Sequence, residues 1–92
     1  MSLRIKGVIV PLLTPFDRQG ALDHAALARL VEFLIARGVQ GLFPGGTTGE
    51  GPLLTLDERR ALAETVVRAA GGRVPVIIHT GAITTRDAVA LT

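Results

Sequence analysis

The chain has 92 residues, enough for one small domain or for part of a larger one. It is 48% hydrophobic but only 3% aromatic, so its apolar residues are mainly Leu, Val, Ile and Ala, the mix expected of buried parallel strands covered by helices. The net charge of +2 comes from scattered arginines with no basic patch interleaved with aromatic residues, which argues against nucleic-acid binding.

The first apolar run covers residues 7–13, is rich in Val and Ile, and predicts a buried strand. Pro11 lies inside this run and cannot donate a hydrogen bond to a neighbouring strand. The strand therefore either ends near Val10 or places Pro11 where no donor is needed. A loop is expected at residues 14–22, with a turn at residues 17–20, whose sequence is Asp-Arg-Gln-Gly.

The first helix is predicted to follow Asp23, a residue type that favours the N-cap position. Apolar residues then recur at i, i+3, i+4, i+7 and i+8 and form one stripe at helical period: Leu27, Leu30, Val31, Leu34 and Ile35. Gly38 suits the position just after the helix. The second apolar run, residues 39–44, starts at once, and so short a helix-to-strand link is typical of α/β proteins.

This second run leads into a glycine-rich segment at residues 41–51, with the sequence Gly-Leu-Phe-Pro-Gly-Gly-Thr-Thr-Gly-Glu-Gly. The hydroxyls of Thr47 and Thr48 and the N–H groups of the turn suit a carboxylate or a phosphate, and a hydroxyl can also relay a proton. A tight turn followed by a helix cap explains the same residues equally well. The P-loop and dinucleotide motifs are excluded, because no lysine follows and the third glycine is missing.

The second helix is predicted to start with a capping box formed by Thr55 and Glu58. It should run to about residue 70, with one apolar face that carries Leu62, Val66 and Ala69. The glycine pair at residues 71–72 is expected to end it.

A third strand is expected at residues 76–79, and a third helix should be capped by Thr84 or Thr85, with Asp87 in its first turn. The resulting order, β-α-β-α-β-α with short links, predicts an α/β fold with parallel strands and right-handed crossovers. In such folds active sites form at the carboxyl ends of the strands, where Thr47 and Thr48 lie.

Two other polar residues, Glu50 and His79, have two interpretations each. Glu50 could act as a general acid or base, but a loop carboxylate that holds backbone amides is favoured. His79, at the end of the third strand, could line a site or be a core histidine satisfied by a hydrogen bond. His24 is expected to be solvated. Lys6, the single lysine, precedes the first strand, at the end of the sheet opposite a barrel site, and is expected at the surface. No His and carboxylate set has metal-ligand spacing, so no metal is expected.

Three segments together resemble the dihydrodipicolinate synthase / N-acetylneuraminate lyase family: residues 8–16 (VIVPLLTPF), 46–50 (GTTGE) and 74–78 (VPVII). Their order and spacing agree with the family across nearly the whole chain. The resemblance implies a (β/α)8 TIM barrel in the parent protein. Residues 1–92 would supply about the first three βα units, as the N-terminal (βα)3 portion of a single barrel domain.

The resemblance also implies the chemistry of a class I aldolase or lyase, in which a lysine forms a Schiff base with pyruvate or another 2-oxo acid. Gly46, Thr47 and Thr48 would bind the substrate. Thr48 and the loop amides would hold its carboxylate, and Thr47 would relay protons to a tyrosine. In the family that lysine belongs to the sixth strand and the tyrosine to the fifth, so the isolated chain is expected to be inactive. No cofactor is expected.

Two other interpretations remain open at this stage. One is a small α/β module that binds an acidic ligand or another subunit; the other is a barrel enzyme of a different family with a phosphate-binding loop. Phosphate sites in barrels usually follow strands seven and eight, which disfavours the latter. The sequence has no cysteine and no apolar run of about 18 residues, so no membrane partner is expected and a cytoplasmic location is compatible. The full-length protein is expected to be a homo-oligomer, either a dimer or a tetramer.

Overall fold

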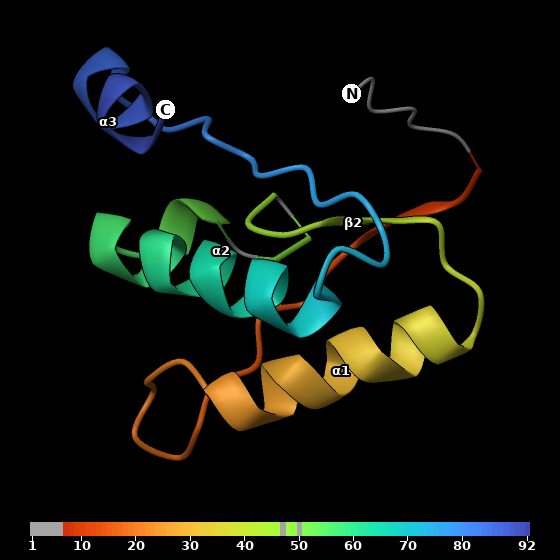
Figure 1. Cartoon of the computed structure of the whole chain (residues 1–92). Helices are drawn as coiled ribbons and strands as arrows, with labels where there is room; N and C mark the ends of the chain where they lie inside the picture. Colours follow the sequence, from red (N-terminus) through yellow and green to blue (C-terminus); the bar gives the residue numbers. More distant parts are fainter. Residues whose placement is uncertain (1–6, 47, 50) are drawn as a thin grey trace.

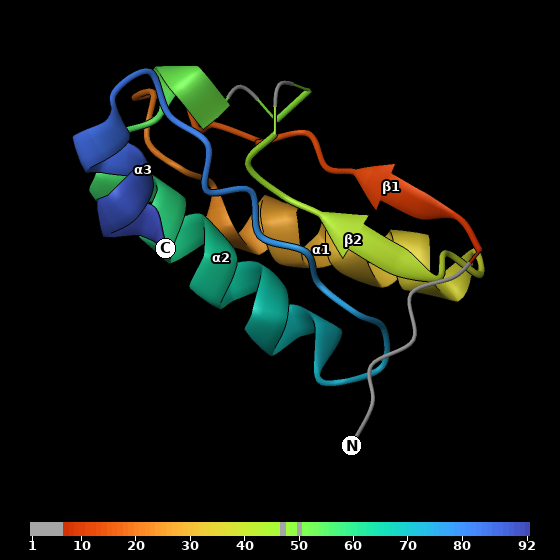
Figure 2. The same ribbon diagram turned by 90° about the horizontal axis from the view of Figure 1, so that it is seen from above.

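The computed structural model of the chain describes residues 7–46, 48, 49 and 51–92. Its elements, in chain order, are β1 (Ile9–Pro11), α1 (His24–Ala36), β2 (Gly41–Phe43), the 3₁₀ turn η1 (Gly51–Leu53), α2 (Leu56–Ala70) and α3 (Thr85–Leu91). Helices α1 and α2 lie side by side and cover the same face of the strands (Figures 1 and 2). The short helix α3 lies beyond them, at the end of a long extended segment (Figure 1).

Strands β1 and β2 pair in parallel, as predicted, with Val10 opposite Leu42 and Pro11 opposite Phe43. The N–H of Leu12 donates to the carbonyl of Phe43 (3.0 Å), so the even-numbered residues of this segment direct their N–H groups toward β2. The nitrogen of Pro11 therefore points away from β2, toward the open edge of the sheet. The second alternative for Pro11 is confirmed, because the strand contains it at a position that needs no donor.

The prediction of a regular third strand at residues 76–79 is wrong. The segment runs extended beside β2, but it forms only an isolated parallel bridge between Leu42 and Val76. Pro44 explains why the pairing stops. The next bridge would need a donor at residue 44, and proline has none. Only the opposite bond remains, from the N–H of His79 to the carbonyl of Pro44, and it is long at 3.4 Å.

The helix boundaries follow the predicted caps. Asp23 accepts a hydrogen bond from the N–H of Ala26, and Thr55 forms the complete capping box of α2. Thr84, rather than Thr85, caps α3. The side-chain oxygens of these caps satisfy N–H groups that have no partner inside the helix.

A single apolar core fills the space between the strands and the two long helices. Its buried side chains come from both sheet and helices: Leu12, Leu27, Val31, Leu42, Leu54, Leu62, Val66 and Ala70. Each large aliphatic side chain buried in this way stabilises the fold by about 1.5–3 kcal/mol. None of the helices among the described residues is long and apolar enough to cross a membrane.

Candidate active-site loop

The glycine-rich loop leaves the carboxyl end of β2 and returns to the start of α2. Within it, the N–H of Gly51 donates to the carbonyl of Gly46 (3.0 Å), and the N–H of Leu54 donates to the carbonyl of Gly51 (3.1 Å). These bonds turn the chain sharply and lead into η1, which the sequence analysis did not anticipate. Thr47, Glu50 and Lys6 lie outside the described residues, so their predicted roles stay predictions.

Two glycines of this loop are required by close backbone packing. A Cβ atom at Gly51 would overlap the carbonyl oxygen of Gly45. A Cβ atom at Gly49 would lie 2.6 Å from the carbonyl oxygen of Leu12, closer than a real contact allows. The loop is therefore folded against itself on one side and against the end of β1 on the other.

Of the predicted binding residues, the structure describes Gly46 and Thr48. Gly46 is buried, and a Cβ atom there would meet the ring of Phe43 at 3.1 Å. Thr48 is exposed and lines an open hollow of about 490 Å³ with Leu13 and Thr14, which follow β1, and with residues of α1. The position of Thr48 leaves room for a ligand, and binding by Gly46 and Thr48 remains a prediction.

Thr14 connects the segment after β1 to the loop. Its side chain is buried, with 7% of the residue exposed, and its hydroxyl donates a hydrogen bond to the carbonyl of Gly49. A buried hydroxyl without a partner would be costly, so this bond satisfies Thr14 as well as fixing Gly49. From the sequence, Thr14 was expected only as the first residue of a loop.

His79 lies against the other end of the loop. Its Nδ1 atom is 3.1 Å from the carbonyl oxygen of Gly45, and its ring packs edge-on against Phe43, with centroids 5.7 Å apart. Of the two interpretations offered for His79, the structure supports the histidine that is held by hydrogen bonds. It nevertheless lies at the carboxyl end of the strands, next to the candidate site.

Arg59 of α2 is the charged residue that sequence reasoning missed. It is only 5% exposed, and its guanidinium donates to the carbonyls of Gly81 (2.6 Å) and His79 (2.7 Å). Its Nε atom has no hydrogen-bond partner among the described residues. Burial lowers the pKa of Arg59 below its usual value because desolvation disfavours the charged form. A signal existed, since Arg59 precedes Leu62 by three positions and Val66 by seven, on the apolar stripe of α2.

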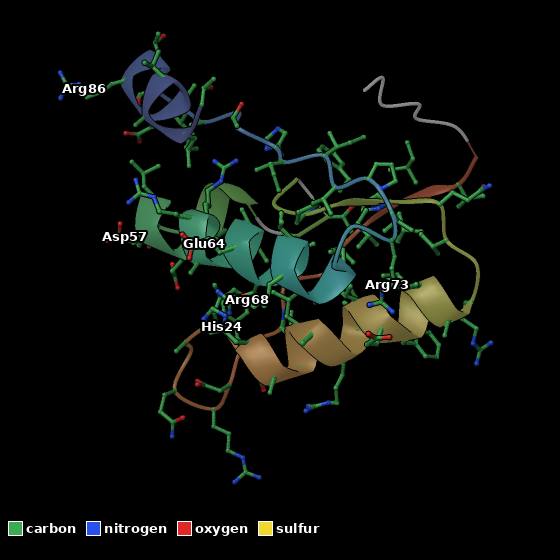
Figure 3. All side chains as sticks on the ribbon, in the orientation of Figure 1. His24, Asp57, Glu64, Arg68, Arg73 and Arg86 are labelled. Atoms are coloured by element: carbon green, nitrogen blue, oxygen red, sulfur yellow. The ribbon has the colours of Figure 1, made fainter. Side chains whose placement is uncertain are left out.

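The remaining polar contacts lie on the helices. His24 is exposed, as expected, but its Nδ1 atom is 2.6 Å from the hydroxyl of Thr65, which links α1 to α2. His24, Glu64 and Arg68 line one hollow between these helices (Figure 3). Within the described ranges, no three His, Cys, Asp or Glu side chains are close enough together to hold a metal ion.

Comparison with known proteins identifies the family. The sequence profile of the dihydrodipicolinate synthetase family matches residues 4–92. N-acetylneuraminate lyase of Escherichia coli is 45% identical over 87 residues, which is 95% of this chain and 29% of the lyase. Dihydrodipicolinate synthase from Aquifex aeolicus is similar in structure, with a TM-score of 0.90 and 43% identity over 96% of this chain and 30% of the synthase.

A third similar structure is dihydrodipicolinate synthase from Acinetobacter baumannii in complex with pyruvate, with a TM-score of 0.91 and 38% identity over 97% of this chain and 31% of that enzyme. The chain thus spans about 30% of the length of the relatives it matches. These relatives are TIM-barrel enzymes, which confirms the predicted fold class. The matches cover nearly the whole chain, and this chain belongs to the dihydrodipicolinate synthetase family.

Proposed function

We propose that residues 1–92 form the N-terminal (βα)3 portion of a single TIM-barrel domain in a Schiff-base lyase or aldolase that acts on pyruvate or a related 2-oxo acid. The observation that carries this proposal is the glycine-rich loop at the carboxyl end of β2, in a chain of this family. The pyruvate complex of the Acinetobacter baumannii relative supports a small 2-oxo acid as the ligand.

In this proposal the loop supplies binding and proton relay. Gly46 and Thr48 bind the substrate carboxylate, and the hydroxyl of Thr47 passes protons to a tyrosine elsewhere in the barrel. A lysine outside this chain condenses with the keto group and releases water. The resulting iminium nitrogen accepts the electron pair when the carbon–carbon bond at the neighbouring α carbon breaks, and the enamine so formed donates that pair back when the bond forms. No metal or cofactor is needed for these steps.

Exposed apolar surface supports the view that more of a barrel packs against this chain. Large hydrophobic side chains are exposed on several elements: Val8, Leu13, Phe16, Phe33, Leu53, Val67, Ile78, Ile83 and Val89. Ile83, just before α3, is 90% exposed. The outer edge of β1 also has no neighbouring strand among the described residues. Open edges and apolar patches of this kind are usually covered in a stable protein.

The test is a chimera in which residues 4–92 replace the matching segment of the Escherichia coli lyase. We expect the folded chimera to cleave N-acetylneuraminate and to form a stable pyruvyl adduct with borohydride, measured by mass spectrometry. Thr48→Val should raise the KM, whereas Thr65→Val, the same change at the contact between α1 and α2 and away from the loop, should leave it unchanged. A folded chimera that neither cleaves this substrate nor traps pyruvate would refute the proposal.

The isolated 92-residue chain provides a second test, because its single lysine is Lys6. We expect no adduct after treatment with pyruvate and borohydride. An adduct on Lys6 would mean that the chain carries its own Schiff-base lysine. The proposal that this lysine lies outside residues 1–92 would then be wrong.

A further inference from the structure

Two side chains from different parts of the chain contact the glycine-rich loop, one near each end. Thr14, which follows β1, donates its hydroxyl proton to the carbonyl of Gly49. His79, at the end of the extended segment beside β2, places Nδ1 3.1 Å from the carbonyl of Gly45. The loop is therefore hydrogen-bonded to the segments that lie on both sides of β2.

The contact of His79 depends on which ring nitrogen carries the proton. Nδ1 is 3.1 Å from both the carbonyl of Gly45 and the NH2 group of Arg59, and it cannot donate to the first and accept from the second at once. Arg59 has a shorter acceptor in the carbonyl of His79, at 2.7 Å. The arrangement that satisfies the most groups has Nδ1–H donating to Gly45 while Arg59 holds the backbone of His79.

These contacts matter because a peptide unit is planar. When the carbonyl of Gly45 is held, the N–H of Gly46, which belongs to the same peptide unit, is fixed in the opposite direction. Gly46 is one of the residues proposed to bind the substrate carboxylate. At the other end, the carbonyl of Gly49 is held by Thr14, and the carbonyl of Leu12 lies so close that a Cβ atom at Gly49 would not fit.

We propose that Thr14 and His79 are positioning residues that fix the two ends of the glycine-rich loop, and that Arg59 fixes His79. This inference rests on the proposed function of the loop as a carboxylate-binding element. The positioned loop binds the substrate without having to be ordered first, so its fixed geometry lowers the cost of binding. Neither side chain has to touch the substrate for this effect.

The experiment uses the chimera with the Escherichia coli lyase. Thr14→Val and His79→Leu should each raise the KM about tenfold with a smaller change in kcat, as expected for the loss of one hydrogen bond that orders a binding loop. Thr14→Ser should restore the KM. His79→Asn should also restore it, because its amide can donate from near the Nδ1 position, whereas His79→Gln should not. Thr65→Val is the matched threonine control.

Hydrogen exchange gives a readout that does not depend on activity. In Thr14→Val and His79→Leu, the amides of residues 45–51 should exchange faster, with Gly51 as the most informative position because its N–H donates within the loop. Unchanged exchange and unchanged KM in an active chimera would overturn the positioning roles. A folded but inactive chimera whose loop still loosens would support positioning and count against the proposed function alone.

Discussion

Replacing the buried guanidinium of Arg59 should destabilise the fold strongly. Arg59→Met keeps an unbranched apolar stem but removes the donors to the carbonyls of Gly81 and His79. A hydrogen bond from a charged group contributes about 1.5–3 kcal/mol, so two contribute about 3–6 kcal/mol. Part of this is offset, since the variant no longer buries a charge. We expect a net loss of about 2–4 kcal/mol in the free energy of unfolding.

The assay is urea unfolding of the chimera that carries residues 4–92. Arg60→Met is the matched control, because Arg60 is the next residue of the same helix and is exposed. Arg59→Lys should lie between wild type and Arg59→Met, since an ammonium keeps the charge but lacks the planar fork that reaches two carbonyls. Hydrogen exchange should increase mainly in residues 76–81. If Arg59→Met and Arg60→Met unfold at the same urea concentration, the buried contacts do not contribute as argued.

Three further changes have defined outcomes. Thr55→Ala should cost about 1 kcal/mol of stability, measured by urea unfolding, because it removes one half of the capping box; no shift would contradict the role of the cap. Gly51→Ala should abolish cleavage by the chimera, since its Cβ would overlap the Gly45 carbonyl, and wild-type activity would mean that the loop adapts. The hydrogen bond from Arg73 lowers the pKa of Glu32 in the folded protein. This ion pair therefore adds a small amount to the free energy of unfolding at pH values above 4.5, the ordinary pKa of the group, and that amount is lost as the pH falls below it. Glu32→Gln should remove that part of the acid dependence of the melting temperature, and an identical pH profile would refute it.

The helices could be predicted from the sequence because their signals are local. Asp23 and Thr55 were expected at N-caps, and both accept hydrogen bonds from the first helical turn. The apolar stripe of the first helix was equally reliable, since Leu27 and Val31 are fully buried. Each of these features depends on residues three or four positions apart, so one segment contains all the information.

The missed features depend on contacts between distant segments. The third strand was predicted from its own apolar residues, but its pairing depends on Pro44, which directly follows β2 and lacks a donor. The role of Thr14 depends on Gly49, 35 positions away, and that of Arg59 on carbonyls 20 and 22 positions away. A hydroxyl or a guanidinium that binds a backbone carbonyl leaves no residue-type signature at its acceptor. Only the burial of Arg59 could have been inferred, from its place on the stripe of α2.

The position of β2 explains how the loop can be fixed within this chain. β2 lies between β1 and the extended segment that contains Val76, so the loop that leaves β2 has a neighbour on each side. Thr14 comes from one neighbour and His79 from the other, and a chain that ended before the third segment would have the first contact without the second. Two βα units and the extended segment that follows them are thus the shortest length that completes both contacts. The loop proposed to bind the 2-oxo acid can therefore take its shape from these elements, and in the proposed function the Schiff-base lysine lies elsewhere in the barrel.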